Sequence, residues 1–109
     1  MSYSVLSISP FDKQLKRLIK KYPSLKEEFL DLVDMLIQDP FQGKPLGKNC
    51  FKLRLSVKSK NKGKSGGVRI ITHIAVIDRK LYLLSIYDKL EIESLSDKEI
   101  LDLLEFIEE

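Results

Sequence analysis

The chain has 109 residues, the size of one domain, and we expect residues 1–109 to form a single domain. Hydrophobic residues make up 43% of it and charged residues 32%, a balance that excludes a disordered chain and favours a compact soluble protein. Its apolar stretches are too short to cross a bilayer, and its first residues lack the pattern of a signal peptide. We therefore expect a cytoplasmic protein with no membrane partner.

The charges are segregated along the chain. Between Asp39 and Asp78 there are nine Lys and Arg and no acidic residue. The other ten basic residues accompany all sixteen carboxylates, so the net charge of +3 combines +9 in the middle with −6 elsewhere. Such segregation attracts and orients a polyanion, which favours contact with nucleic acid over a merely solvated loop.

The N-terminal part of the chain predicts a strand and two helices. Residues 4–8 are rich in β-branched and aliphatic side chains, as in a short strand. Ser9 has the residue type of an N-cap, and apolar residues then recur at helical spacing. Ser24 and Glu27 have the spacing of a capping box before a second helix, which ends at Asp39-Pro40. We expect the two helices to pack as an antiparallel hairpin.

The middle of the chain predicts two strands. Residues 40–49 contain two glycines and two prolines and predict a loop. From Phe51 to Lys58, apolar residues alternate with mainly basic ones, which predicts a half-buried strand with a cationic outer face. Residues 59–67 have no apolar side chain and predict a mobile hairpin loop, and residues 68–77 are apolar enough for a central strand.

The last part of the chain adds a strand and a helix. Residues 81–87 predict a third strand after a tight turn, and residues 88–95 lead away from the sheet. Ser96 and Glu99 form a capping box that opens the last helix. The predicted order is β-α-α-β-β-β-α, an α+β fold with a helical hairpin packed on one face of a small, mainly antiparallel sheet.

Residues for metal or disulfide chemistry are scarce. Cys50 is the only cysteine and His73 the only histidine, so an intrachain disulfide is excluded and a structural zinc site is disfavoured. For Cys50, a small buried hydrophobic residue is the favoured interpretation. Because residues 40–77 contain no carboxylate, a nuclease site on this segment would act without a metal, and we expect no cofactor.

Metal-free cleavage of RNA fits the residues that are present. The 2′-hydroxyl attacks the neighbouring phosphorus, cations stabilise the developing charge, and Lys, His or Tyr can transfer protons. A lone arginine that opens an apolar strand needs a task or a partner, so Arg69 is favoured as functional. His73 could instead be a core or rim histidine, and Tyr87 an amphipathic ring that closes a strand. The candidate catalytic residues are Arg69, Arg54, Lys52, His73 and Tyr87.

Two segments resemble a known family. Residues 51–73 resemble the basic strand, the loop and the Gly-x-Arg strand of RelE/ParE-superfamily toxins, especially of their HigB-like branch. Residues 81–89, with their Tyr-x-Lys ending, resemble the third strand of that branch, and the predicted order of elements is the RelE-like fold. The resemblance implies a type II toxin, a ribosome-dependent endoribonuclease (mRNA interferase) that cuts mRNA and is held inactive by a cognate antitoxin.

The resemblance also implies roles for individual residues. Arg69 matches the strand arginine that contacts the scissile phosphate, and Lys52 and Arg54 lie on the strand that supplies further basic groups. The expected partners are the ribosome, mRNA and a helix-turn-helix antitoxin. Two alternatives stay open: a ParE-like gyrase poison, and a non-catalytic RNA-binding relative. The lysines expected to contact RNA are Lys58, Lys60, Lys62, Lys64 and Lys89.

Overall fold

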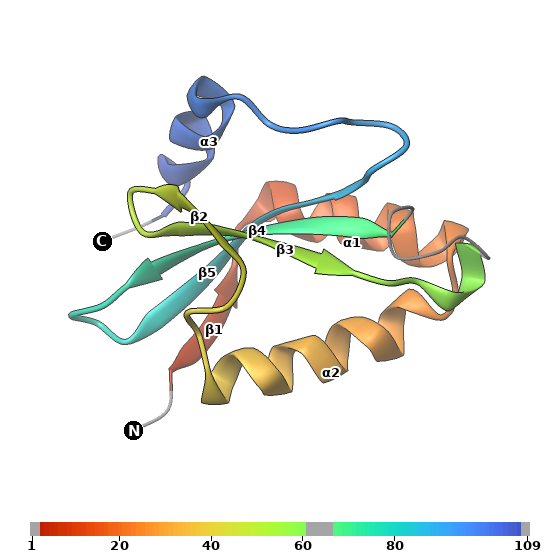
Figure 1. Cartoon of the computed structure of the whole chain (residues 1–109), viewed down its shortest axis with the longest axis horizontal. Coiled ribbons are helices and arrows are strands. Elements are labelled where there is room, and N and C mark those ends of the chain that lie inside the picture. Colours follow the sequence, from red (N-terminus) through yellow and green to blue (C-terminus); the bar gives the residue numbers. More distant parts are fainter. Residues whose placement is uncertain (1–2, 61–66, 108–109) are drawn as a thin grey trace.

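The computed structural model describes residues 3–60 and 67–107, so Lys62 and Lys64 lie outside the described residues. Three α-helices accompany a five-stranded sheet in this part of the chain (Figure 1). The elements in chain order are β1 (Ser4–Ser7), α1 (Ser9–Lys21), α2 (Leu25–Gln38), β2 (Lys44–Gly47), β3 (Cys50–Leu55), the 3-10 turn η1 (Lys58–Lys60), β4 (Val68–Ala75), β5 (Lys80–Asp88) and α3 (Asp97–Leu104).

The sheet is mainly antiparallel, as predicted. Its strand order is β1-β5-β4-β3-β2, and only β1 pairs in parallel with its neighbour, among the described strands. Strand β4 lies in the middle, which explains why its residues are buried on both faces. A bulge in the pairing of β4 with β5 falls between Ile71 and Thr72 and brings Leu83 opposite Thr72.

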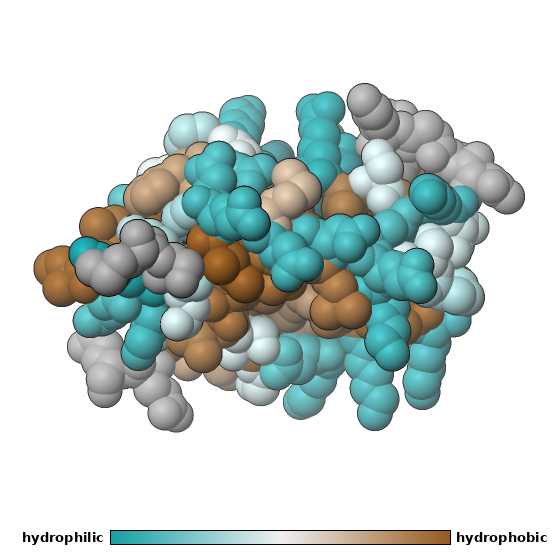
Figure 2. Space-filling model, turned by 90° about the horizontal axis from the view of Figure 1, so that it is seen from below, coloured by the Kyte–Doolittle hydropathy of each residue, from teal (hydrophilic) through white to brown (hydrophobic). Residues whose placement is uncertain are grey.

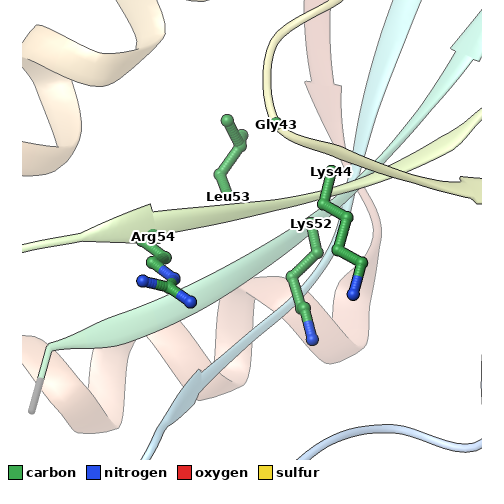
Figure 3. Close-up of a pocket in the computed structure, with 5 residues that line it drawn as sticks. All are labelled: Gly43, Lys44, Lys52, Leu53 and Arg54. Carbon is green, nitrogen blue, oxygen red and sulfur yellow. The ribbon is translucent and has the colours of Figure 1, made fainter. Parts of the chain in front are cut away.

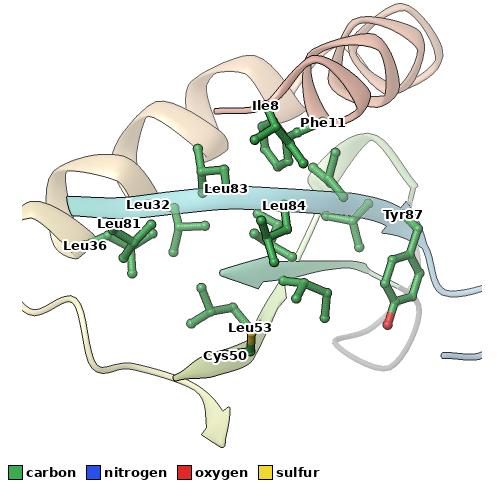
Figure 4. Packing of buried hydrophobic residues seen from close by; sticks show 14 of the residues in the cluster. Ile8, Phe11, Leu32, Leu36, Cys50, Leu53, Leu81, Leu83, Leu84 and Tyr87 are labelled. Carbon is green, nitrogen blue, oxygen red and sulfur yellow. The ribbon is translucent and has the colours of Figure 1, made fainter. Parts of the chain in front are cut away.

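Helices α1 and α2 cover one face of the sheet, and the apolar stripes predicted for them form the core. Leu18 of α1 and Leu36 of α2 are fully buried, and the rings of Phe11 and Phe29 lie 5.7 Å apart where the two helices meet. Figure 4 shows this core between the two helices and the sheet, with Tyr87 directed away from the helices. Helix α3 lies on the opposite side of the sheet from α2 (Figure 1). The α+β architecture is thereby confirmed.

Residues 40–49 differ from the prediction of a loop. Residues 44–47 form the edge strand β2, which reaches β3 through a tight turn with positive φ at Gly47, Lys48 and Asn49. Pro45 does not prevent this, because a strand at the edge of a sheet does not need every N–H for pairing. The prediction failed because proline and glycine in four residues outweighed the weak signal of so short a strand.

The helix caps were predicted with mixed success. The capping box of Ser96 and Glu99 is present in both directions. The N-cap of α1 is Ile8 rather than Ser9, and no side chain caps it. The capping box predicted at Ser24 is absent, because the Ser24 hydroxyl instead donates to Glu28 and accepts from the N–H of Ser59, at 3.0 and 2.9 Å.

Candidate active site

The sheet face that carries Tyr87 brings cations from three neighbouring strands together. Arg54 of β3 stands opposite Arg69 of β4, and Arg69 stands opposite Tyr87 of β5. One step along β3 on the same face, Lys52 stands opposite Lys44 of β2. Because side chains two residues apart share a face, these two rows lie about 7 Å from each other. We call these five residues the cationic row site.

Part of the cationic row site lines a pocket. Figure 3 shows the side chains of Lys44, Lys52 and Arg54 extending to one side of the sheet, whereas Leu53 extends to the other. The pocket has a volume of about 360 Å³. Three cations beside one hollow provide converging donors for an anion such as a phosphate group. The residues that line the pocket are Gly43, Lys44, Lys52, Leu53 and Arg54.

Arg69 is buried although it carries a charge. It is 5% exposed, and its Nη1 donates to the carbonyl oxygen of Val68 at 3.4 Å. Within residues 3–60 and 67–107, no carboxylate forms an ion pair with it. Burial, and next the charge of Arg54, lower the pKa of Arg69. A buried guanidinium without a counter-ion is costly, and a bound anion would relieve that cost.

Gly67 fixes the approach to Arg69. A Cβ atom at this position would clash with the carbonyl oxygen of Leu55, at the end of β3. Only glycine allows the backbone to pass so close, and the pairing of β3 with β4 begins at the next residue, Val68. This gives a physical reason for the glycine in the Gly-x-Arg pattern of the sequence.

Tyr87 lies at the β5 end of the row, opposite Arg69, and its hydroxyl is buried. The residue is 2% exposed, and its Oη makes no hydrogen bond with any group in the described part of the chain. Burial raises the pKa of Tyr87, and the charge of Arg69 opposes this only in part. The phenol therefore keeps its proton at neutral pH and can act as a donor.

Lys52 is the cation best suited to lose a proton. Burial lowers the pKa of Lys52, and so do the neighbouring charges of Lys44, Lys89, Arg69 and Arg54, in that order. A lysine with a lowered pKa is neutral in a larger fraction of molecules and can accept a proton. The site thus combines a potential proton acceptor on β3 with a potential donor on β5.

His73 does not join the row of Arg54, Arg69 and Tyr87, although it lies only two residues beyond Ile71, which pairs with Lys52. His73 lies four residues beyond Arg69 on β4, about 13 Å along the strand. Its Nδ1 lies 3.6 Å from the Sγ of Cys50, and burial lowers the pKa of His73. Cys50 is 1% exposed and burial raises the pKa of its thiol, so the prediction of a small buried residue is confirmed.

The lysines predicted to contact RNA fall into different environments. Lys58 is exposed, whereas Lys89 is half-buried and its Nζ donates to the carbonyl oxygen of Glu93 at 2.9 Å. Lys60 was expected in an exposed loop, and this is wrong: residues 58–60 form η1, and Lys60 is buried in an ion pair with Asp88. Its ammonium is therefore not presented to a ligand in this structure.

Two parts of the site were missed from the sequence. Lys44 was placed in a loop, although the mainly basic outer face of β3 could have suggested a second basic strand beside it. The sequence did not indicate that Asp88 would pair with Lys60, because a single carboxylate after a strand is common.

Within the described ranges, no three His, Cys, Asp or Glu side chains come together as metal ligands. No helix in those ranges has the length and apolarity needed to cross a bilayer.

Comparison with known proteins identifies the fold. No known protein family matches the sequence by its profile. The structure is similar to that of an arginine-to-alanine double variant of the E. coli toxin RelE in the free state, with a TM-score of 0.63 and 15% sequence identity. The similarity covers 99% of this chain and 100% of the RelE chain. This chain therefore has the RelE-like fold predicted from its sequence, and at this identity the likeness concerns the fold alone.

Proposed function

We propose that this protein is the toxin of a type II toxin–antitoxin system and acts as a ribosome-dependent mRNA endoribonuclease of the HigB-like branch. Residues 1–109 would form one toxin domain that works in the cytoplasm. The observation that carries the proposal is the row of Arg54, Arg69 and Tyr87 across three strands of a RelE-like fold. Two cations and an unpartnered buried hydroxyl in one row fit a phosphodiester better than a protein target.

Four residues of the cationic row site would take part in the cleavage. Lys52 takes the proton of the 2′-hydroxyl, whose oxygen attacks the adjacent phosphorus. Arg69, which is buried, and Arg54, which is exposed, donate to the phosphate oxygens and stabilise the added negative charge. Tyr87 donates its proton to the departing 5′-oxygen, which leaves a 2′,3′-cyclic phosphate and a free 5′-hydroxyl. Backbones of β3 and β5 lie about 10 Å apart, so acid and base can reach a phosphate from opposite sides.

Arg69→Ala tests the proposal. Loss of one preorganised donor to a developing oxyanion costs about 2.7–4 kcal/mol, so cleavage should fall by about 10²–10³-fold. Induced expression followed by mapping of mRNA 5′ ends should show codon-phased cuts with the parent chain and few or none with the variant. Lys80→Ala, at the far end of β5, is the matched control and should keep full activity.

Other outcomes would favour the alternatives. Intact messages together with DNA damage and an induced repair response would indicate a ParE-like gyrase poison. Growth that is unaffected by the parent chain would favour a non-catalytic RNA-binding relative. Full toxicity of Arg69→Ala would show that the cationic row site is not the active site.

The proposed antitoxin has two surfaces to contact. An acidic segment would cover the cations of the row, and apolar groups would engage α2, where Leu30 and Met35 are each 53% exposed. Figure 2, a view from the α2 side, shows apolar side chains gathered in the middle of this face among hydrophilic ones. Co-expression with the adjacent reading frame, expected to encode a helix-turn-helix protein, should restore growth and yield a complex that copurifies.

A further inference from the structure

A buried charge network lies directly behind the cationic row site. Asp88, the last residue of β5, is 1% exposed, and its Oδ1 accepts a hydrogen bond from the ammonium of Lys60. Oδ1 also accepts from the N–H of Leu90 at 2.9 Å, and Oδ2 accepts from the hydroxyl of Tyr22 at 2.7 Å. The Lys60 ammonium also lies 5.2 Å from the centre of the Tyr22 ring. We call these residues the Asp88 network.

The Asp88 network joins segments that the sheet itself does not hold together. Lys60 follows β3, Tyr22 follows α1, and Leu90 follows β5. Strands β3 and β5 are separated by β4, whose first residue, Val68, pairs with Leu55 on one side and with Asp88 on the other. The Lys60–Asp88 ion pair therefore links the segment after β3 to the end of β5, across the end of β4 that carries Arg69.

The energetics of such a pair point to a role beyond stability. Burial raises the pKa of Asp88, but the hydrogen bonds from Lys60 and Tyr22 outweigh it and lower that pKa, so the carboxylate stays charged. A buried ion pair of this kind can often be replaced by neutral groups with little loss of stability. Neutral groups would not reproduce the three directional hydrogen bonds that converge on the Asp88 carboxylate and fix the positions of their donors.

We propose that the Asp88 network is a positioning device, which holds Tyr87 beside Arg69 and fixes the backbone on both sides of the cationic row site. Asp88, Lys60 and Tyr22 touch no substrate. Lys60 and Tyr22 hold Asp88, and Asp88 acts through Tyr87, its neighbour in sequence, and Val68, its partner in register. The inference rests on the proposed nuclease function. It assigns to Lys60 a place in the site's framework instead of a contact with RNA.

The test compares one charge removed with both removed. Lys60→Met alone leaves a buried carboxylate without its cation and should lower the melting temperature by at least about 10 °C. Lys60→Met combined with Asp88→Asn keeps an acceptor for the N–H of Leu90 and should restore most of that loss. In single-turnover cleavage of ribosome-bound mRNA, the double variant should still react about 100-fold more slowly at saturation, with half-saturation unchanged within about twofold.

Two further variants keep the test decisive. Tyr22→Phe removes one donor only, so it should lower the melting temperature by much less than Lys60→Met does, and it should slow cleavage about tenfold even if the double variant does not fold. Arg17→Gln breaks the exposed ion pair of Arg17 with Glu91, which joins α1 to the same segment, and should change neither rate nor stability. Parental rates in both the double variant and Tyr22→Phe would overturn the inference and leave the network a purely structural role.

Hydrogen exchange separates this inference from the proposed function. In the double variant the amides of Tyr87 and Leu90 should exchange at least about tenfold faster than in the parent, whereas the amide of Ile71 in the centre of β4 should not change. If the parent chain does not cut mRNA, the proposed function fails and exchange alone decides whether the network fixes this end of the sheet. Unchanged exchange at both Tyr87 and Leu90 would refute the positioning role.

Discussion

Removal of the Tyr87 hydroxyl should change stability and activity in opposite directions. The residue is 2% exposed, and its Oη has no hydrogen-bond partner among the described residues. A buried hydroxyl without a partner costs about 1–3 kcal/mol relative to a hydrated one. Tyr87→Phe keeps the ring and removes that cost, so the free energy of unfolding should rise by about 1 kcal/mol. For a chain of this size the melting temperature should rise by about 4 °C.

The same change should slow cleavage. A general acid contributes about 10²–10⁴-fold to a reaction rate, so Tyr87→Phe should lower the single-turnover rate by at least about 100-fold, or about 2.7 kcal/mol of transition-state stabilisation. The two measurements are thermal unfolding of the isolated protein and single-turnover cleavage of ribosome-bound mRNA. Half-saturation should stay close to that of the parent, because the arginines that bind the phosphate remain.

Thr72 provides the matched control. Its Oγ1 is also buried without a partner in the described residues, but Thr72 pairs with Leu83, which places it outside the row. Thr72→Val should therefore raise stability as Tyr87→Phe does and leave cleavage unchanged. A destabilised Tyr87→Phe would mean that the hydroxyl has a partner in the free protein. A fully active Tyr87→Phe would remove Tyr87 from the mechanism.

Two further predictions concern the cations of the row. Arg54→Gln removes a like charge opposite Arg69 and should raise stability by about 0.2–1 kcal/mol in denaturant titrations while weakening RNA binding. The proposed base, Lys52, can accept a proton only when it is neutral, so cleavage should rise with pH as Lys52 loses its proton. Burial and then the charge of Lys44 lower the pKa of Lys52. Lys44→Gln removes a repulsion, raises that pKa and should move the rise in the pH–rate profile to higher pH, whereas Lys80→Gln should leave the profile in place.

The sequence predicted which side chains share a face, because alternation is a local property. Period two in the strands that became β3 and β4 placed Lys52 with Arg54, and Arg69 with His73. It could not predict register, which depends on the length of the connection and on the packing of Gly67 against β3. Register decides that Arg54 faces Arg69 and that His73 faces Cys50, four residues along β4 from Arg69. The shared face and four members of the cationic row site were therefore predictable, whereas the pairing of Arg54 with Arg69 and the place of Lys44 were not.

The burial of Lys60 was beyond sequence reasoning for a different reason. The lysines and polar residues around Lys60 have the composition of a solvated loop. Composition describes the segment as a whole and cannot show which of its residues are buried. The partner that buries Lys60 is Asp88, which lies 28 positions away in the sequence. A contact of this kind is set by tertiary packing, so no local pattern distinguishes Lys60 from Lys58, which stays exposed.

The polar groups at this end of the sheet separate into two kinds. Asp88 is buried and its hydrogen-bonding capacity is met by Lys60, Tyr22 and Leu90, so it has little to offer a ligand. Tyr87 and Arg69, one residue away in sequence or in register, are buried without an equivalent partner in the described part of the chain. Buried donors without an acceptor lower the free energy of unfolding of the free protein, and an anion bound between Tyr87 and Arg69 would raise it again. This contrast between neighbouring residues, more than the number of cations, supports the proposed phosphate site over a solvated basic surface.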